Sequence, residues 1–375
     1  MNGCCPIINR FATYFNESEQ IMHPYIPASV QGPIQDIKIT DEALFWYPWI
    51  ANISNKNIYL MLQAQWGPNG EYPDPPPPGY EYYITSGDSY MFGLPEYMAK
   101  HVDGKIIHLT GSIIPDSFDT DRVQYVSYNN AHRRISRIPR TPTLSKNIQY
   151  KTSALTNRVT QSKAIVFAAL KHYLGKDCVT SLHHNLYGEK NIHSWQLTGN
   201  HTCDFFLQQF QNQWLHTKLK LPQDDDIEGS YNNTAYQQAA LNFTQESYHY
   251  SFTLQGGRSF IQPGPFVTEK TWKSLLSSTA FISVGQAYVY RWLRSLGLRF
   301  DYGPLDLGFD EDSGNLTRLE KIVTLIESLQ SWSAHDLYEM TRDSTEYNAQ
   351  YVQSSEFWKL CEGTNQSVNQ LLGSL

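Results

Sequence analysis

One stretch of the sequence places lysines where the charge of a helix disfavours them. Residues 264–285 read GPFVTEKTWKSLLSSTAFISVG, and the middle of this stretch predicts a helix whose first turns carry Lys270 and Lys273. The exposed N–H groups of a helix N-terminus act as roughly half a positive charge, so each lysine there is unfavourable by a few tenths of a kcal/mol. We therefore expect a negatively charged group near this helix start, either within the chain or on a ligand.

A diphosphate is the ligand that fits this pattern. Thr268 is suited to cap the helix through its hydroxyl, Glu269 takes the first helical position, and Lys270 points toward the same free N–H groups. Helix amides together with an ammonium group suit a diphosphate, whose charge would satisfy both. Lys273 lies one turn further on, where we expect it to be solvated. The alternative is a capped surface helix whose Glu269 balances the dipole.

The surrounding elements predict an α/β protein in two halves. Short runs rich in β-branched and aromatic residues, typical of buried strands, alternate with segments of helical spacing. The predicted strands are 57–64, 81–87, 105–111, 123–129, 178–185, 279–285 and 298–303; the predicted helices are 162–175, 287–297 and 315–329, with further helices in 334–375. Residues 150–158 lead into the first of these helices, and no element is predicted for residues 1–40.

A change of composition marks the boundary between the halves. Residues 131–148 carry four arginines and two prolines, which indicates either a solvated loop or a loop that faces phosphate. We therefore predict an N-terminal α/β domain over 1–145, a C-terminal α/β domain over 146–332 and a helical segment over 333–375. Such halves bind ligands at the carboxyl ends of their strands and in the crevice between them.

Composition excludes several classes of protein. The 375 residues are 41% hydrophobic and 17% charged, which indicates a folded chain. The net charge of -7 argues against a protein that binds nucleic acid by neutralising phosphate. Neither an apolar run long enough to span a membrane nor an export signal is present, and the scattered cysteines suggest reduced thiols, so we expect a soluble cytoplasmic protein, in a host cytoplasm if the source is viral.

Two motifs resemble a known family. FVTEKTWKSLLSSTAFISVG followed by YRWLRSLG resembles the C-terminal motif of alpha-1,3-fucosyltransferase-like glycosyltransferases and their bacterial and phage relatives. TSALTNRVTQSKAIVFAAL is similar to the Asn-Arg segment of the same family, and the two motifs occur in the family's order. The resemblance covers roughly 150–330 and departs in the glycine-rich GGRSFIQPGPF and in NFTQESYHY, which matches the family only loosely.

The resemblance implies two Rossmann-like domains of the GT-B type, with a nucleotide sugar as substrate in the C-terminal half and no other cofactor. Lys270 and Arg158 would contact the diphosphate, Glu269 the ribose or the sugar, and Asn157 would orient the loop of the arginine. Thr268 and Glu246 complete the implied substrate-binding set. A bland alternative for Arg158 is an exposed arginine at a helix start.

The implied reaction is metal-independent transfer of a sugar, possibly from a guanosine diphosphate donor, to the hydroxyl of a glycan or another acceptor. Fixed cations and helix amides would stabilise the departing diphosphate, and the acceptor would need a base from the N-terminal half. Asp88, directly after the strand 81–87, is the candidate for that base.

Other features have weaker chemical interpretations. His183 and His184 are interpreted as strand-end histidines, because no third metal ligand has a suitable spacing. Asp224, Asp225 and Asp226 are interpreted as a polar loop, since no apolar strand precedes them. Two other functions stay open: a phage enzyme that glycosylates DNA bases, which would need a basic face, and a non-catalytic relative that kept the fold. That face would be built from Arg133, Arg134, Arg137 and Arg140.

Overall fold

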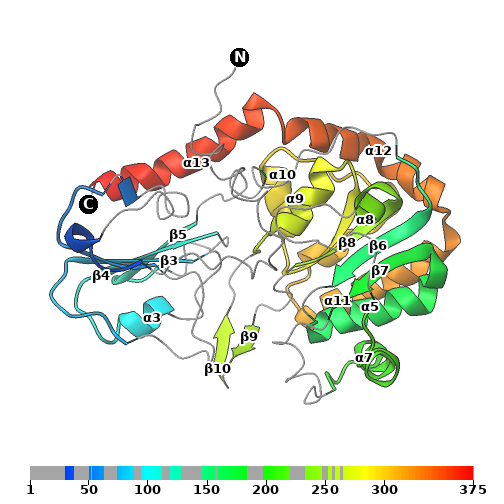
Figure 1. Cartoon of the computed structure of the whole chain (residues 1–375), viewed down its shortest axis with the longest axis horizontal. Coiled ribbons are helices and arrows are strands. Elements are labelled where there is room, and N and C mark those ends of the chain that lie inside the picture. Colours follow the sequence, from blue (N-terminus) through cyan, green and yellow to red (C-terminus); the bar gives the residue numbers. More distant parts are fainter. Residues whose placement is uncertain are drawn as a thin grey trace, which may run out of the picture.

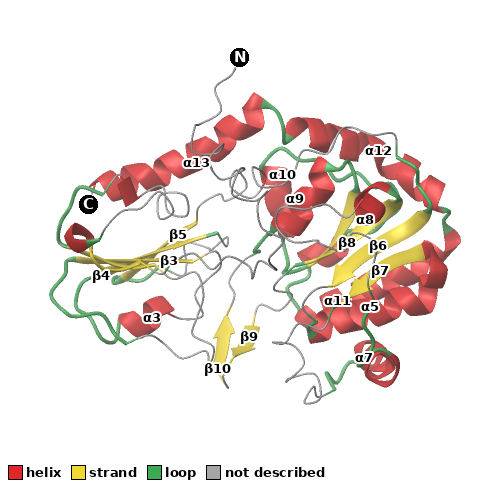
Figure 2. Cartoon of the chain, in the orientation of Figure 1, coloured by secondary structure: helices red, strands yellow, loops and turns green. Residues whose placement is uncertain are grey.

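The computed structural model shows an α/β protein with two separate sheets (Figures 1 and 2). It describes residues 30–37, 50–51, 53–62, 74–87, 94–111, 119–127, 135, 146–156, 159–183, 197–219, 233–246, 252–255, 258–261 and 265–374. The prediction of two α/β halves with parallel strands is confirmed at this level.

The first sheet consists of strands that follow one another in chain order. Its strands are β1 (Val30–Pro33), β2 (Ile58–Leu62), β3 (Tyr82–Gly87), β4 (Lys105–Thr110) and β5 (Val123–Ser127). β2 to β5 are parallel, and β1 pairs with β2 in the antiparallel direction. The short helices η1 (Ile34–Asp36) and α3 (Leu94–Met98) accompany them. The strands predicted over 57–129 are confirmed, whereas β1 lies in a region for which no element was predicted.

Both faces of the first sheet are covered, which explains why its strands are apolar without alternation. One face, with Leu60 and Ile107, packs against Val368 and Leu372 near the C-terminus of the chain. The other face, with Tyr83 and Ile106, forms a separate core with Met98 of α3.

The second sheet has four parallel strands in the order β11-β8-β6-β7. They are β6 (Tyr150–Thr156), β7 (Cys178–Leu182), β8 (Ala239–Gln245) and β11 (Ala280–Val284). An antiparallel pair, β9 (Phe252–Gln255) and β10 (Arg258–Ile261), lies outside both sheets. The helices around the sheet are α5 (Gln161–Leu174), η4 (Gly175–Asp177), α7 (His201–Gln213), α8 (Asn233–Gln237), α9 (Glu269–Leu276), α10 (Val289–Ser295), η5 (Gly308–Glu311), α11 (Asn315–Ser328) and η6 (Leu329–Ser331).

The predicted helices of the second half are confirmed, and their ends have the expected causes. Gly175 after α5 and Gly297 after α10 have φ values of 50° and 89°, which non-glycine residues rarely adopt. Burial of α5 is broader than the one apolar face that the sequence predicts, because α7 and α11 cover the side that the sheet leaves open.

The predicted strand at 298–303 is wrong. No strand forms there, because α12 (Ala334–Tyr351) provides the hydrogen-bond partners that a neighbouring strand would otherwise offer. The Asn348 side chain accepts from the Arg299 N–H (2.8 Å) and donates to the Arg299 carbonyl (2.6 Å). The Ser344 hydroxyl bridges the N–H and carbonyl of Asp301 in the same way, at 3.1 Å each.

The two C-terminal helices connect the two halves of the molecule. α12 packs against strands of the second sheet, and α13 (Ser355–Ser374) brings Val368 and Leu372 to the first sheet (Figure 1). The helices predicted over 334–375 are present, but the last of them belongs to the core of the first sheet. Among the residues described, no helix is both long enough and apolar enough to cross a membrane.

Candidate functional site

The second sheet has one point where the strand order reverses. β6 lies in its centre, with β7 on one side and β8 on the other, so the connections that follow β6 and β7 leave in opposite directions. In open parallel sheets, ligands bind at such a point, outside the carboxyl ends of the strands. The ends of β6 and β8 are therefore the first place to look for a site.

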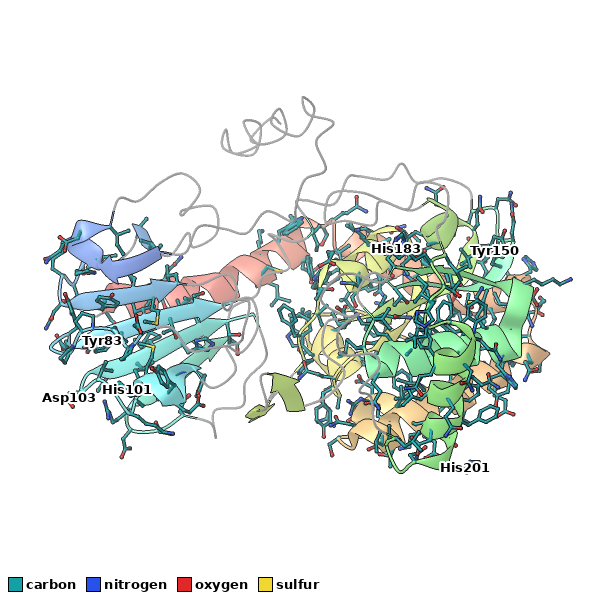
Figure 3. The ribbon with its side chains drawn as sticks, turned by 60° about the horizontal axis from the view of Figure 1, so that its bottom comes forward. Tyr83, His101, Asp103, Tyr150, His183 and His201 are labelled. Atoms are coloured by element: carbon teal, nitrogen blue, oxygen red, sulfur yellow. The ribbon has the colours of Figure 1, made fainter. Side chains whose placement is uncertain are left out.

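The carboxyl ends of the strands lie toward the middle of the molecule. In Figure 3, Tyr150 at the start of β6 and Asp103 just before β4 lie toward opposite ends of the long axis. His183, directly after β7, lies between them. The carboxyl edge of the second sheet thus points toward the first sheet, as the predicted position of a ligand between the halves requires.

Two buried polar side chains meet where β6 and β8 end. The Thr156 hydroxyl donates to Oε1 of Gln245 over 2.7 Å, and both residues are at most 1% exposed. Nε2 of Gln245 has no hydrogen-bond partner among the residues that the structure describes. Because buried amide hydrogens almost always have a partner, this group indicates that a further polar atom belongs at the switch point.

A carboxylate from the next residue connects β8 with α9. Glu246 accepts a hydrogen bond from the Thr268 N–H (3.2 Å), a short one from the Thr268 hydroxyl and one from the Thr271 hydroxyl (2.7 Å). It is 1% exposed, and its own N–H donates to the Val284 carbonyl over 3.2 Å. Glu246 therefore fixes the start of α9 against the ends of β8 and β11.

These contacts identify the negative charges at the start of α9. Thr268 caps the helix and Glu269 is its first residue, as predicted; the Thr268 hydroxyl accepts from the Lys270 N–H over 3.5 Å. The Lys270 ammonium lies 2.8 Å from the Glu269 carboxylate and 3.3 Å from the Thr268 hydroxyl. Carboxylates of the chain itself thus stabilise both the helix amides and the lysine.

The prediction that Lys273 is solvated is wrong, since its side chain is fully buried. α9 packs against both β11 and α12, and its residues from Thr271 to Leu275 are all buried. Sequence periodicity shows only one apolar face on this helix and does not reveal the second neighbour.

α5 begins at the same edge, and its first turn, unlike the starts of α9 and α10, has no carboxylate among the described residues that accepts from it. The N–H groups of Val289 and Tyr290, at the start of α10, donate to the Asp310 carboxylate at 2.8 and 2.9 Å, and α9 has Glu246. Burial raises the pKa of Asp310 to about 6. In contrast, α5 has no acidic residue in its first turn, and no described side chain caps it. Within the described residues, the start of α5 is thus a helix N-terminus with no acidic residue in its first turn and no side-chain cap, a position that suits an anion.

A buried arginine on α11 supports the end of β11. Nε of Arg318 donates to the Gly285 carbonyl (3.2 Å), and Nη1 donates to the Asp312 carbonyl (2.8 Å). Arg318 is 1% exposed. Sequence analysis missed it, along with Thr156, Gln245 and Thr271. Thr156 and Gln245 end β6 and β8, two strands that the sequence did not predict, and nothing in the periodicity of α11 distinguishes Arg318.

Several predicted residues fall outside the described part of the chain. Asp88 directly follows β3, and Asn157 and Arg158 directly follow β6, so the strands that lead to all three are described but the residues are not. His184, the aspartates 224–226 and the arginines 133, 134, 137 and 140 are also outside it. His183 is described at the end of β7 and is half-buried. No group of three or more metal-ligating side chains is found among the described residues.

Comparison with known proteins does not identify a family for this chain. No family model, no curated protein and no solved structure matches the chain significantly.

Proposed function

We propose that the chain is a glycosyltransferase of the GT-B type that transfers a sugar from a nucleotide diphosphate to an acceptor hydroxyl. The observation that carries the proposal is the switch point between β6 and β8, where α5 begins without an acidic residue and where Nε2 of Gln245 has no hydrogen-bond partner among the described residues. The two motifs that resemble fucosyltransferase-like enzymes flank this point, at the end of β6 and at the start of α9.

In this proposal the diphosphate lies at the start of α5. Arg158, two residues beyond β6, and Lys270 on α9 would approach it from either side, and Asn157 would orient the loop between them. The diphosphate would compete with Glu269 for the Lys270 ammonium, which is about one-fifth exposed in its present ion pair. Glu269 would then be released toward the ribose or the sugar.

Glu246 and Thr268 contribute by fixing the position of α9. With three donors already on its carboxylate, Glu246 holds α9 at the distance from β8 that Lys270 needs. Each cation and each helix amide would stabilise the charge that develops on the departing diphosphate, and losing one such contact raises a barrier by about 3 kcal/mol. Asp88 would accept the proton of the acceptor hydroxyl from the end of β3.

A thermal-shift screen against nucleoside diphosphates and nucleotide sugars tests donor binding. A ligand at 100 times its dissociation constant adds about 2.7 kcal/mol to the free energy of unfolding. We expect Arg158→Ala and Lys270→Ala to weaken binding at least tenfold. Lys176→Ala is the matched control, because it removes an exposed lysine beyond the opposite end of α5. If no ligand raises the melting temperature, or if both variants respond like the parent, the donor site is wrongly assigned.

Turnover separates an enzyme from a non-catalytic relative. Asp88→Asn should bind the donor with the affinity of the parent and release nucleoside diphosphate from it much more slowly in the presence of acceptor. A parent chain that binds the donor and never releases nucleoside diphosphate would instead be a binding protein with this fold. Salt-sensitive binding of duplex DNA, lost when the four arginines of 133–140 are changed to alanine, would favour the DNA-modifying alternative.

A further inference from the structure

Four consecutive prolines precede β3 and have a backbone shape that covalent geometry dictates. Residues 74–80 read DPPPPGY. Each proline ring holds φ near −65°, and the helical region is sterically disfavoured for a residue that precedes proline. Residues 74–77 all precede proline, and the structure assigns neither helix nor strand to them. The segment is therefore a short polyproline II helix, an extended conformation with three residues per turn and no internal hydrogen bonds.

One side of this segment is fixed to the first sheet. Pro76 is buried, and the hydroxyl of fully buried Tyr83 donates to the Pro77 carbonyl over 2.9 Å. The same hydroxyl accepts from the Tyr80 N–H at 3.3 Å. Gly79 ends the run with a φ of 101°. The segment is thus held as a rigid rod before any partner binds.

The other side faces solvent. Pro75, Pro77 and Pro78 are exposed. Pro75 and Pro78 are three residues apart, so they lie on the same side of the polyproline helix. Asp74 and Glu81 flank the prolines and are also exposed, but Glu81 has the exposed Lys105 beside it, since the Lys105 N–H donates to the Glu81 carbonyl over 2.9 Å.

The rod lies far from the carboxyl edge of the second sheet. Tyr83, to which it is bonded, lies near the outer end of the first sheet, together with His101 and Asp103 (Figure 3). A partner could therefore dock there without covering the switch point between β6 and β8.

We propose that residues 74–79 are a docking ligand for a partner protein with an aromatic-lined, proline-binding groove. Aromatic grooves of the SH3, WW and EVH1 kind bind such segments because the extended helix is already formed and loses little entropy on binding. Pro75 and Pro78 would enter the groove, and Asp74 would lie at its rim. This docking is independent of the glycosyltransferase proposal.

Calorimetric titration of the full chain with purified SH3, WW and EVH1 domains tests the proposal. We expect saturable binding to at least one domain with a dissociation constant below about 1 mM. The double variant Pro75→Ala/Pro78→Ala should weaken it at least tenfold. Pro304→Ala, which changes an exposed proline without proline neighbours, should leave it unchanged.

A second measurement covers the case in which the double variant does not fold. A synthetic peptide with residues 73–80 should compete with the parent chain for the same domain. Absence of binding to all three kinds of domain would overturn the proposal, and so would a folded double variant that binds like the parent or a peptide that fails to compete.

Discussion

Replacing Glu246 tests whether its carboxylate is the charge that stabilises the start of α9. Glu246→Ala leaves the buried Thr268 N–H without an acceptor, which costs about 1–3 kcal/mol, whereas the two threonine hydroxyls can rotate toward other acceptors. One buried methylene group adds about 0.8 kcal/mol, and the lost charge at the helix N-terminus adds up to about 1 kcal/mol. We expect the free energy of unfolding to fall by about 2–5 kcal/mol in total.

Glu246→Gln separates the charge from the shape of this side chain. The amide keeps the methylenes and an oxygen for Thr268, and its nitrogen can donate to the Thr271 hydroxyl. Only the charge is lost, so the expected decrease is about 1–2 kcal/mol. Glu269→Ala is the control, because it removes a carboxylate from the same helix start whose partly exposed ion pair contributes at most about 1 kcal/mol.

Urea unfolding and hydrogen–deuterium exchange of peptides from α9 measure this series. The free energy of unfolding should decrease from the parent to Glu246→Gln and again to Glu246→Ala, and exchange in α9 should accelerate in the same order. If Glu246→Ala destabilises the protein no more than Glu269→Ala does, the carboxylate does not stabilise α9 and the account of the charges at its start is wrong.

Two further predictions concern the amino edge of the second sheet and the segment after α10. Burial lowers the pKa of Lys146 to about 7, so between pH 7 and 10 the unfolded chain holds more protons than the folded chain, and the free energy of unfolding should rise with pH. Urea unfolding at pH 7 and at pH 9 should show that the parent gains stability relative to Lys146→Met at the higher pH. No gain, or a loss, would contradict the lowered pKa. Asn348→Ala should destabilise the protein by about 2–4 kcal/mol, because the buried Asn348 side chain loses both of its partly buried hydrogen bonds to Arg299. Gln350→Ala, an exposed change on α12, should cost less than about 0.5 kcal/mol in the same urea experiment. Equal effects of the two variants would show that the 298–303 segment does not depend on Asn348.

The local sequence pattern predicted most helices and strands, because the residues that define them act mainly through neighbours in the sequence. The apolar spacing of 315–329 and the glycines at 175 and 297 fix helix bodies and helix ends through nearby atoms. β8 was not predicted, since AALNFTQ interrupts its apolar residues with Asn242, Thr244 and Gln245. These polar groups are acceptable in a buried central strand because partners from elsewhere reach them: Asn242 donates to the Ser274 hydroxyl, and Gln245 accepts from Thr156.

The sequence by itself determined the α/β class, the helix that Thr268 caps and the extended backbone of the proline run, because each depends on covalent geometry or on contacts within a few residues. Only the tertiary structure decided the strand order that puts the ends of β6 and β8 side by side, the burial of Lys273 and Arg318, and the return of α13 to the first sheet. It also decided which negative charges stabilise the start of α9. Glu246 lies 22 residues before Thr268, and only the parallel pairing of β8 with β11 brings its carboxylate to the helix amides.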